Sequence, residues 1–280
     1  MRVIAERGRT AIGAGWRPEL ALVIDQNPAL DFLEVTAENI DLAAVPAALQ
    51  LLRDRGLPIT VHGLSLSLGG TEPINRGRIE RLRRLAEKLG APLVSEHVAF
   101  VRAEGVEVGH LLPVPRTEVA MDLLAENVGT VKRIIGRPLA LENIATFIEW
   151  GDGELDEPAF FCELLERTDS LLLLDVSNLY ANCRNHGWDA NAYLRRMPLH
   201  RLAYVHIGGG VERHGLYHDT HAHSLPEGAL NLLEELCAIV RPPAVMLERD
   251  DEIDQRFDLA LELARMRGAI ERGEHRRNGS

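Results

Sequence analysis

Short apolar runs recur along the chain, and a segment with helical periodicity follows most of them. Two of these runs, 171–175 (LLLLD) and 244–248 (AVMLE), show no polar alternation, which is typical of parallel strands buried on both faces. We predict eight strands, at 11–15, 31–35, 58–62, 92–97, 138–142, 171–175, 202–206 and 244–248.

The segments between these runs predict amphipathic helices, with leucines at three- and four-residue spacing opposite charged residues. The predicted helices cover 42–54, 78–89, 117–135, 157–167, 227–240 and 254–267. Gly56, Gly90 and Gly136 stand just past three of them, and a proline opening the next strand soon follows each glycine. A helix stop followed by a buried strand is the repeating unit of a βα fold.

Eight such units predict a single-domain (β/α)8 TIM-type barrel over residues 1–267, because that fold needs about 250 residues. The segment 98–116 alternates around Gly105 and predicts a hairpin-like insertion over one mouth of the barrel. Residues 268–280 are polar, and we expect this tail to be frayed.

Composition narrows the functional class. The chain has 280 residues and a net charge of −11, with 42 acidic against 31 basic residues, which disfavours a nucleic-acid partner. The three cysteines show no CxxC spacing, so we expect them to be reduced and the protein to be cytoplasmic. No apolar run is long enough for a membrane span, and the N-terminal residues contain no apolar signal region.

Metal-competent side chains stand at the ends of the predicted strands. They are His62, Glu96, His97, Glu142, Asp175, His206 and Glu248. The carboxyl ends of the strands of a (β/α)8 barrel meet at one mouth, where active sites are found. That many buried ionisable groups would repel one another and lose hydration unless cations compensated them. Any single one has an ordinary structural explanation, but the set together predicts a metal centre.

A histidine-rich segment, 204–223, adds further ligands. It contains five of the eleven histidines and also Asp219. With Asp219 and His221 included, the chain offers more nitrogen and oxygen ligands than one metal ion uses, so we expect roughly two or three metals. Glu142 or Glu248 is suited to bridge two of them. Asn178, three residues past Asp175, offers an amide oxygen, and Glu34 is either an outer ligand, a supporting partner or structural.

The order and spacing of these motifs resemble a known family. The motifs are VHGLSLSLGG, SEHVAF, LLPVPRTEVA, LENIATFI, LLLLDVSNLYANCRNHGWD, VHIGGG, HDTHAH and MLERDDEI. Together they resemble the multinuclear non-haem iron-dependent oxidative enzymes, the methanobactin-oxidase-like peptide-modifying family, over residues 13 to 254. One departure is Ser177, which replaces an asparagine usual in the family, while Asn178 is kept.

The resemblance implies a barrel that holds two or three irons and uses dioxygen to oxidise a ribosomally made precursor peptide, often at cysteine. It implies three ligand sets: His62, His97 and Glu142; Glu142, Asp175, His206 and Glu248; and Asn178, Asp219 and His221. It also implies that Glu142, His186 and His223 serve in catalysis, the two histidines near the substrate. A separate partner protein that recognises the leader peptide is expected, since no such module is visible in this chain.

The ligand types alone leave other functions open. Barrels of the xylose-isomerase and apurinic-endonuclease types also gather His, Asp and Glu around divalent metals, for isomerisation or phosphoester hydrolysis. A noncatalytic metal-sequestering protein is a third hypothesis, although storage does not require ligands from so many separate strands. The redox assignment therefore depends wholly on the resemblance.

Overall fold

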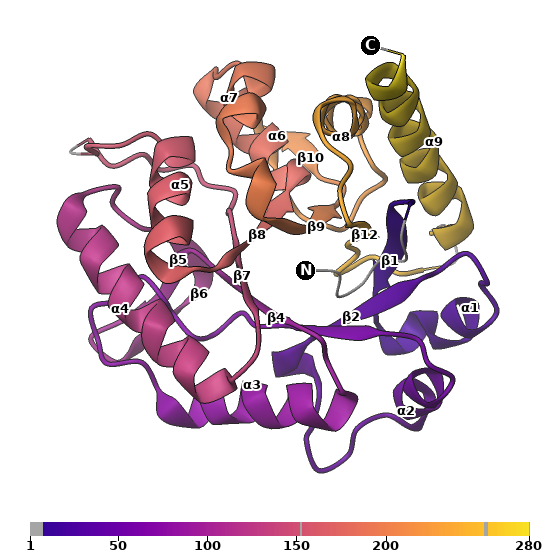
Figure 1. Cartoon of the computed structure of the whole chain (residues 1–280), viewed down its shortest axis with the longest axis horizontal. Helices are drawn as coiled ribbons and strands as arrows, with labels where there is room; N and C mark the ends of the chain where they lie inside the picture. The colour runs from indigo at the N-terminus through magenta and orange to yellow at the C-terminus, as the bar shows by residue number, and fades with distance from the viewer. Residues whose placement is uncertain (1–7, 152, 255–256, 280) are drawn as a thin grey trace.

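A computed structural model gives the fold of the chain and describes residues 8–151, 153–254 and 257–279. Eight parallel strands close into a barrel surrounded by helices (Figure 1). The barrel strands are β1 (Ala11–Gly15), β2 (Phe32–Thr36), β3 (Ile59–His62), β4 (Val94–His97), β7 (Leu139–Glu142), β8 (Leu171–Asp175), β9 (Leu202–Ile207) and β12 (Ala244–Leu247). Their order around the barrel follows the chain, and β12 pairs with β1 to complete it. The predicted single-domain (β/α)8 barrel and its eight strands are confirmed.

In the described part of the chain, the α-helices that cover the barrel are α1 (Ala21–Asp25), α2 (Ala47–Asp54), α3 (Arg76–Leu89), α4 (Glu118–Ile135), α5 (Glu157–Thr168), α6 (Val176–His186), α7 (Ala190–Arg196), α8 (Glu227–Ile239) and α9 (Leu259–Asn278), with 3-10 turns η1 (Pro18–Leu20), η2 (Ala37–Asn39) and η3 (Leu199–Arg201). Six of these nine α-helices overlap the predicted ones, and α1, α6 and α7 are not predicted from the sequence. Helix α2 begins later than predicted, because the proline ring of Pro46 disfavours helical backbone at Val45. Gly90 and Gly136 end α3 and α4 in the left-handed conformation expected of a helix stop.

The prediction that the tail after residue 267 is frayed is wrong. Helix α9 runs on to Asn278, where the sequence predicts an end near residue 267. Its buried side includes Ala269, Ile270 and Gly273, which pack beside α8. Arg272 and Arg276 also pair with glutamates of α8. The polar composition of this segment therefore belongs to the outer face of a docked helix.

The inward-facing side chains of the barrel change character along the strands. Since successive strand residues point to opposite faces, every second residue enters the interior. Near the start of the strands these residues are apolar, and Phe32, Leu173, Tyr204 and Met246 belong to one interior cluster. Two residues further along come polar groups, such as Asp175 after Leu173 and His206 after Tyr204. The barrel therefore has an apolar floor beneath a polar layer at its carboxyl end.

Two short hairpins interrupt the βα repeat. β5 (Ala99–Ala103) and β6 (Val106–Pro113) pair antiparallel within the predicted insertion at 98–116. β10 (Val211–Arg213) and β11 (Leu216–His218) pair within the histidine-rich segment, which the sequence did not predict. Both hairpins follow the carboxyl ends of barrel strands, so they stand on the side of the polar layer.

Candidate metal centre

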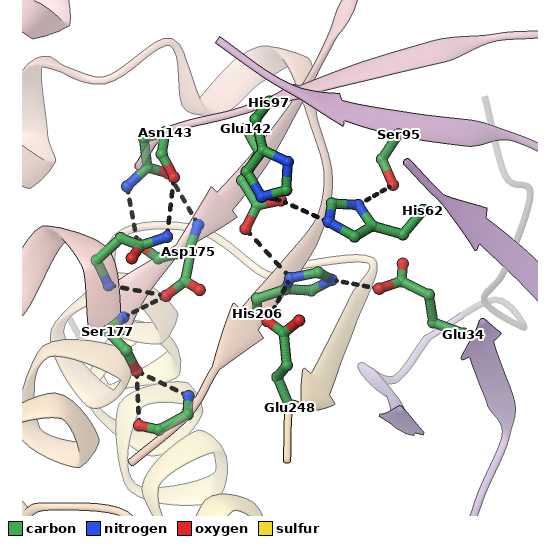
Figure 2. Close-up of polar contacts among 12 residues, drawn as sticks. Glu34, His62, Ser95, His97, Glu142, Asn143, Asp175, Ser177, His206 and Glu248 are labelled. Carbon is green, nitrogen blue, oxygen red and sulfur yellow. Dashed lines mark hydrogen bonds and ion pairs between the residues drawn. The ribbon is translucent and has the colours of Figure 1, made fainter. Parts of the chain in front are cut away.

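Three buried side chains from β3, β4 and β7 form a first group, consisting of His62, His97 and Glu142. Nε2 of His97 lies 3.2 Å, and Nε2 of His62 lies 3.4 Å, from Oε2 of Glu142. The opposite nitrogen of each ring is hydrogen-bonded: Nδ1 of His62 to Ser95 Oγ at 2.8 Å, and Nδ1 of His97 to the Gly63 carbonyl at 3.2 Å. Each ring therefore presents Nε2 to Glu142 (Figure 2).

A second group shares Glu142 and adds Asp175, His206 and Glu248. Nδ1 of His206 lies 3.2 Å from Oε1 of Glu142 and 3.0 Å from Oε2 of Glu248. Asp175 and His206 face each other across β8 and β9, where they are register partners. All four side chains are buried, and Figure 2 shows them converging from four strands' carboxyl ends.

The histidine-rich segment completes two further groups. Asp175, Asp219 and His221 form one, and His221, Glu248 and Asp250 form the other. Nε2 of His221 lies 2.9 Å from Asp219 Oδ2 and 3.5 Å from Asp175 Oδ2, while its Nδ1 lies 3.3 Å from Glu248 Oε2. In each of the four groups, one ligand atom from every member lies within 4.8 Å of the others.

The glycines at 208–210 allow the histidine-rich segment to reach the barrel mouth. A Cβ on Gly208 would lie 2.4 Å from the His221 ring, and one on Gly209 would lie 2.0 Å from the His223 carbonyl oxygen. Any side chain here would push the segment outward. His221 itself has a φ of 48°, a left-handed conformation that is strained for a non-glycine residue.

The two carboxylate oxygens of Asp175 have different roles. Oδ1 caps the N-terminus of α6 by accepting from the backbone N–H groups of Ser177 and Asn178, at 2.6 and 2.9 Å. Oδ2 is buried and has no hydrogen-bond partner among the described residues. Helix α6 starts directly after Asp175, in a segment where the sequence predicts no helix. This start brings Asn178 to the same edge, with its amide nitrogen donating to the Asn143 carbonyl.

The residues fit a cation better than they fit one another. Several buried polar atoms lack a hydrogen-bond partner within the described part of the chain: Glu142 Oε2, Asp175 Oδ2, Asp219 Oδ1 and both ring nitrogens of His206. The carboxylates near His206 are close, but none is aligned for a hydrogen bond. Buried polar groups are nearly always satisfied, so unsatisfied atoms directed at a shared space are typical of a site that binds a cation. Imidazole nitrogen and carboxylate oxygen suit iron, manganese and zinc.

The electrostatics of the metal-free site show how much these groups need a positive charge. Burial opposes the charge on His97, but Glu142 and Glu96 outweigh it and raise the pKa of His97 to about 9. Burial raises the pKa of Asp175 to about 8, although His221 lowers it. Without a cation the site therefore holds extra protons near neutral pH, which a metal ion would displace.

Five residues considered from the sequence lie outside all four groups: Glu34, Glu96, Asn178, His186 and His223. Glu96 accepts from the backbone N–H groups of Leu66 and His97, so it supports the neighbouring loop. Nε2 of His186 bonds to the Thr146 carbonyl at 2.9 Å, and Nδ1 of His223 bonds to Thr220 Oγ1 at 2.9 Å. The catalytic roles of His186 and His223 stay predictions, as do the ligand sets.

Two features of the site are not predicted from the sequence. Asp250 joins the group around His221 and pairs with Arg17, yet nothing in the sequence ERDDE distinguishes it from the neighbouring Asp251 and Glu252. Ser95 and Tyr204 form hydrogen bonds beneath the site. Ser95 lies two residues before His97, and Tyr204 lies two residues before His206. Because every second residue of a strand faces the same side, strand periodicity predicts that both face the interior.

This fold and this site define a class: a (β/α)8 barrel with buried, metal-competent residues at its carboxyl end. A family model described as "RiPP precursor modification enzyme MbnB/TglH/ChrH" matches residues 11–271. The chain belongs to this family of enzymes that modify ribosomally synthesised precursor peptides. The family resemblance inferred from the motifs is thereby confirmed.

Similar proteins from several bacteria carry the name UPF0276 protein. The chain is 44% identical to one from Streptomyces avermitilis over 272 residues, which is 95% of this chain but 56% of the relative. The chain therefore spans little more than half of that longer protein. It is 36% identical to a relative from Bordetella pertussis, and the match covers 93% of each protein. It is 34% identical to a relative from Caulobacter vibrioides, and the match covers 93% of this chain and 95% of that relative.

Solved structures share the barrel at low sequence identity. An L-ribulose 3-epimerase superposes with a TM-score of 0.65 at 16% identity, covering 96% of this chain and 97% of the epimerase. A xylose isomerase domain protein from Planctomyces limnophilus gives 0.57 at 13% identity, covering 97% and 99%. These likenesses show the fold alone. In the described part of the chain, no helix is long and apolar enough to cross a membrane.

Proposed function

We propose that the chain is a multinuclear iron-dependent enzyme that uses dioxygen to oxidise a side chain of a precursor peptide. The family supports the peptide substrate. The buried groups of histidine and carboxylate side chains support the metal centre. The use of iron and of dioxygen is suggested by the resemblance of the motifs.

The observation that carries the proposal is the sharing of side chains between groups. Glu142 belongs to the first and second groups, Asp175 to the second and third, and His221 to the third and fourth. A carboxylate offers two oxygens, so Glu142 can hold one cation on each side. One metal ion cannot use ligands spread over linked groups, whereas two or three neighbouring ions can.

The ligand assignment follows these groups. His62, His97 and Glu142 would hold the first iron, and Glu142, Asp175, His206 and Glu248 the second. Asn178, Asp219 and His221 would hold a third, and the amide nitrogen of Asn178 donates to the Asn143 carbonyl, which leaves its oxygen for a cation. Bound iron would supply redox chemistry that zinc or magnesium lacks. The protein fixes the ligands and keeps them buried.

We assign His186 and His223 to the neighbourhood of the peptide, a role that the resemblance of the motifs suggests. A separate protein that recognises the leader peptide completes the proposed system. We keep the cytoplasm as the proposed compartment, because Cys162, Cys183 and Cys237 are all free and a reducing environment keeps thiols so.

The test compares metals and atmospheres with one peptide. Candidate precursor peptides, encoded beside this chain, are incubated with iron-loaded protein and any neighbouring partner protein. We expect dioxygen consumption and a change in peptide mass. Protein loaded with zinc, or iron-loaded protein under argon, should leave the mass unchanged, because an inert metal cannot move electrons to dioxygen.

Turnover that persists under argon with zinc in the site would contradict the oxidative proposal. It would favour a hydrolase or isomerase, which needs its metals only as Lewis acids. Glu142→Gln in the iron-loaded preparation serves as the matched inactive control, since it keeps the side-chain size and removes one negative charge.

A further inference from the structure

A chain of hydrogen bonds runs beneath the first two groups, inside the barrel. The Tyr204 hydroxyl donates to Oε2 of Glu34 at 2.5 Å, and Ser95 Oγ lies 2.7 Å from the same hydroxyl oxygen. Ser95 Oγ in turn lies 2.8 Å from Nδ1 of His62. On the other side, Oε1 of Glu34 lies 3.0 Å from Nε2 of His206. Glu34 therefore connects with one histidine from each of the first two groups, and Figure 2 shows two of these contacts, Glu34 with His206 and Ser95 with His62.

The chemistry of these groups sets the direction of every proton along the chain. A carboxylate only accepts, so the single proton of the Tyr204 hydroxyl goes to Glu34. Tyr204 then accepts the proton of Ser95, and Ser95 accepts the Nδ1 proton of His62. His62 is left with a lone pair on Nε2, the nitrogen that faces Glu142 and the first group.

The second branch acts directly on His206. Nε2 of this ring lies beside Glu34, and Nδ1 lies between Glu142 and Glu248. This contact is an ion-pair contact and is not aligned as a hydrogen bond, but the negative charge of Glu34 at 3.0 Å favours a proton on Nε2 and so leaves the Nδ1 lone pair for the second group. Carboxylates that orient metal-binding histidines through the opposite ring nitrogen are common, and losing one typically lowers metal affinity about 10- to 100-fold.

We propose that Glu34 is the positioning residue for two metal subsites, fixing the tautomer of His206 directly and that of His62 through Tyr204 and Ser95. All five side chains are buried, so water cannot replace a missing member. The first and second subsites are then prepared together by one carboxylate that lies in neither group. This inference rests on the proposed metal centre and adds the device that orders its ligands.

One branch ends at His62 and the other at His206, so substitutions in the two branches should affect different histidines. Tyr204→Phe and Ser95→Ala each cut the His62 branch and leave the contact between Glu34 and His206. Glu34→Gln disturbs both branches, since an amide both donates and accepts. Tyr193→Phe is a matched control, because Tyr193 also donates its hydroxyl to a glutamate, Glu157, outside the four groups.

The experiment uses full-length protein labelled with 15N-histidine and loaded with zinc, which is diamagnetic. Nitrogen chemical shifts identify the tautomer of each ring, and chelator competition gives the zinc affinity. We expect Tyr204→Phe and Ser95→Ala to disturb the His62 signals and weaken one zinc site about 10- to 100-fold, with His206 unchanged. The double variant should lose no more than either single one, because both cut the same branch.

Glu34→Gln should disturb both histidines and weaken two zinc sites, while Tyr193→Phe changes neither. Unaltered tautomers and affinities in Glu34→Gln would overturn the inference, and so would equal effects of Tyr204→Phe on both histidines. Wild-type protein that binds no zinc or iron would instead refute the proposed metal centre. The two failures are therefore distinguishable.

Discussion

Oε1 of Glu142 lies 3.2 Å from Nδ1 of His206, although the two residues belong to strands that are not neighbours in the barrel. The other oxygen of the same carboxylate lies 3.2 Å from Nε2 of His97. One buried carboxylate thus stands between two sets of imidazoles. The histidines hold the pKa of Glu142 below its usual range even against its burial, so it carries the negative charge that two cations would share.

Changing this carboxylate to an amide should empty part of the centre. We expect Glu142→Gln to lose at least one metal ion per chain and to abolish activity, with the fold retained, because the charge between two cations disappears while the volume stays. Metal analysis and circular dichroism measure the two effects. Glu38→Gln is the control, since Glu38 lies at the same mouth outside the groups. Full metal occupancy in Glu142→Gln would make Glu142 an ordinary strand-end residue.

Asp250 provides a milder change at the other edge of the centre. Its Oδ2 lies 3.4 Å from Nδ1 of His221, and its Oδ1 pairs with Arg17. We expect Asp250→Asn to weaken one metal site by about 10-fold, the low end of the effect of an outer-shell carboxylate. Zinc competition with a chelator measures it. The neighbouring Asp251→Asn should have no effect, and equal affinities in the two variants would remove Asp250 from the centre.

The metal-free protein should be less stable in mild alkali. The pKa of His97 rises from 6.5 to about 9, because its carboxylate neighbours outweigh burial, and burial raises that of Asp175 from 3.8 to about 8. A pKa raised by folding stabilises the protein below the unfolded value, and this contribution disappears as the pH passes the folded value. Chelator-treated protein should therefore lose stability to urea between pH 6.5 and 9. A rise over that interval would contradict these shifts.

Much of this fold follows from the sequence, for identifiable reasons. Parallel strands buried on both faces produce runs such as LLLLD, and glycine stops followed by prolines mark three of the helix-to-strand turns. The strand ends then predict which side chains meet, since a barrel brings them to one mouth. His62, Glu142 and His206 are brought together in this way.

The other features of the fold and of the site depend on long-range contacts, which no local sequence pattern predicts. The polar tail docks on α8 because Gly273 allows a close approach of the two helices, and single-sequence periodicity does not show the partner. Helix α6 begins at Val176 because Asp175 caps it, whereas SNLYANC looks like a loop. Glu248 of ERDDE is predicted from its place at the strand end, but the contact of Asp250 with His221 accompanies its ion pair with Arg17, which lies more than 200 positions earlier.

The docking of α9 gives a stability test with an internal control. A Cβ on Gly273 would lie 2.3 Å from the Glu234 carbonyl oxygen and 2.5 Å from Cys237 Cβ, so α8 and α9 would have to separate. We expect Gly273→Ala to lower the free energy of unfolding by about 1–3 kcal/mol. Gly268→Ala, in the same helix, meets only the flexible end of Arg272 and should raise it by about 0.5–1 kcal/mol.

Urea unfolding of both variants measures the difference. Equal stabilities would mean that α9 is not packed at Gly273 and that the tail frays as its composition suggests. A loss confined to Gly273→Ala would show that the C-terminal helix is part of the barrel wall.

The number of irons per chain tests the central claim most directly. Protein produced with iron and purified without chelator is analysed for metals and for protein concentration in the same sample. The linked groups predict roughly two to three irons per chain, given about four to six ligands for each ion. One zinc ion per chain with no iron after that preparation would contradict a multinuclear iron centre.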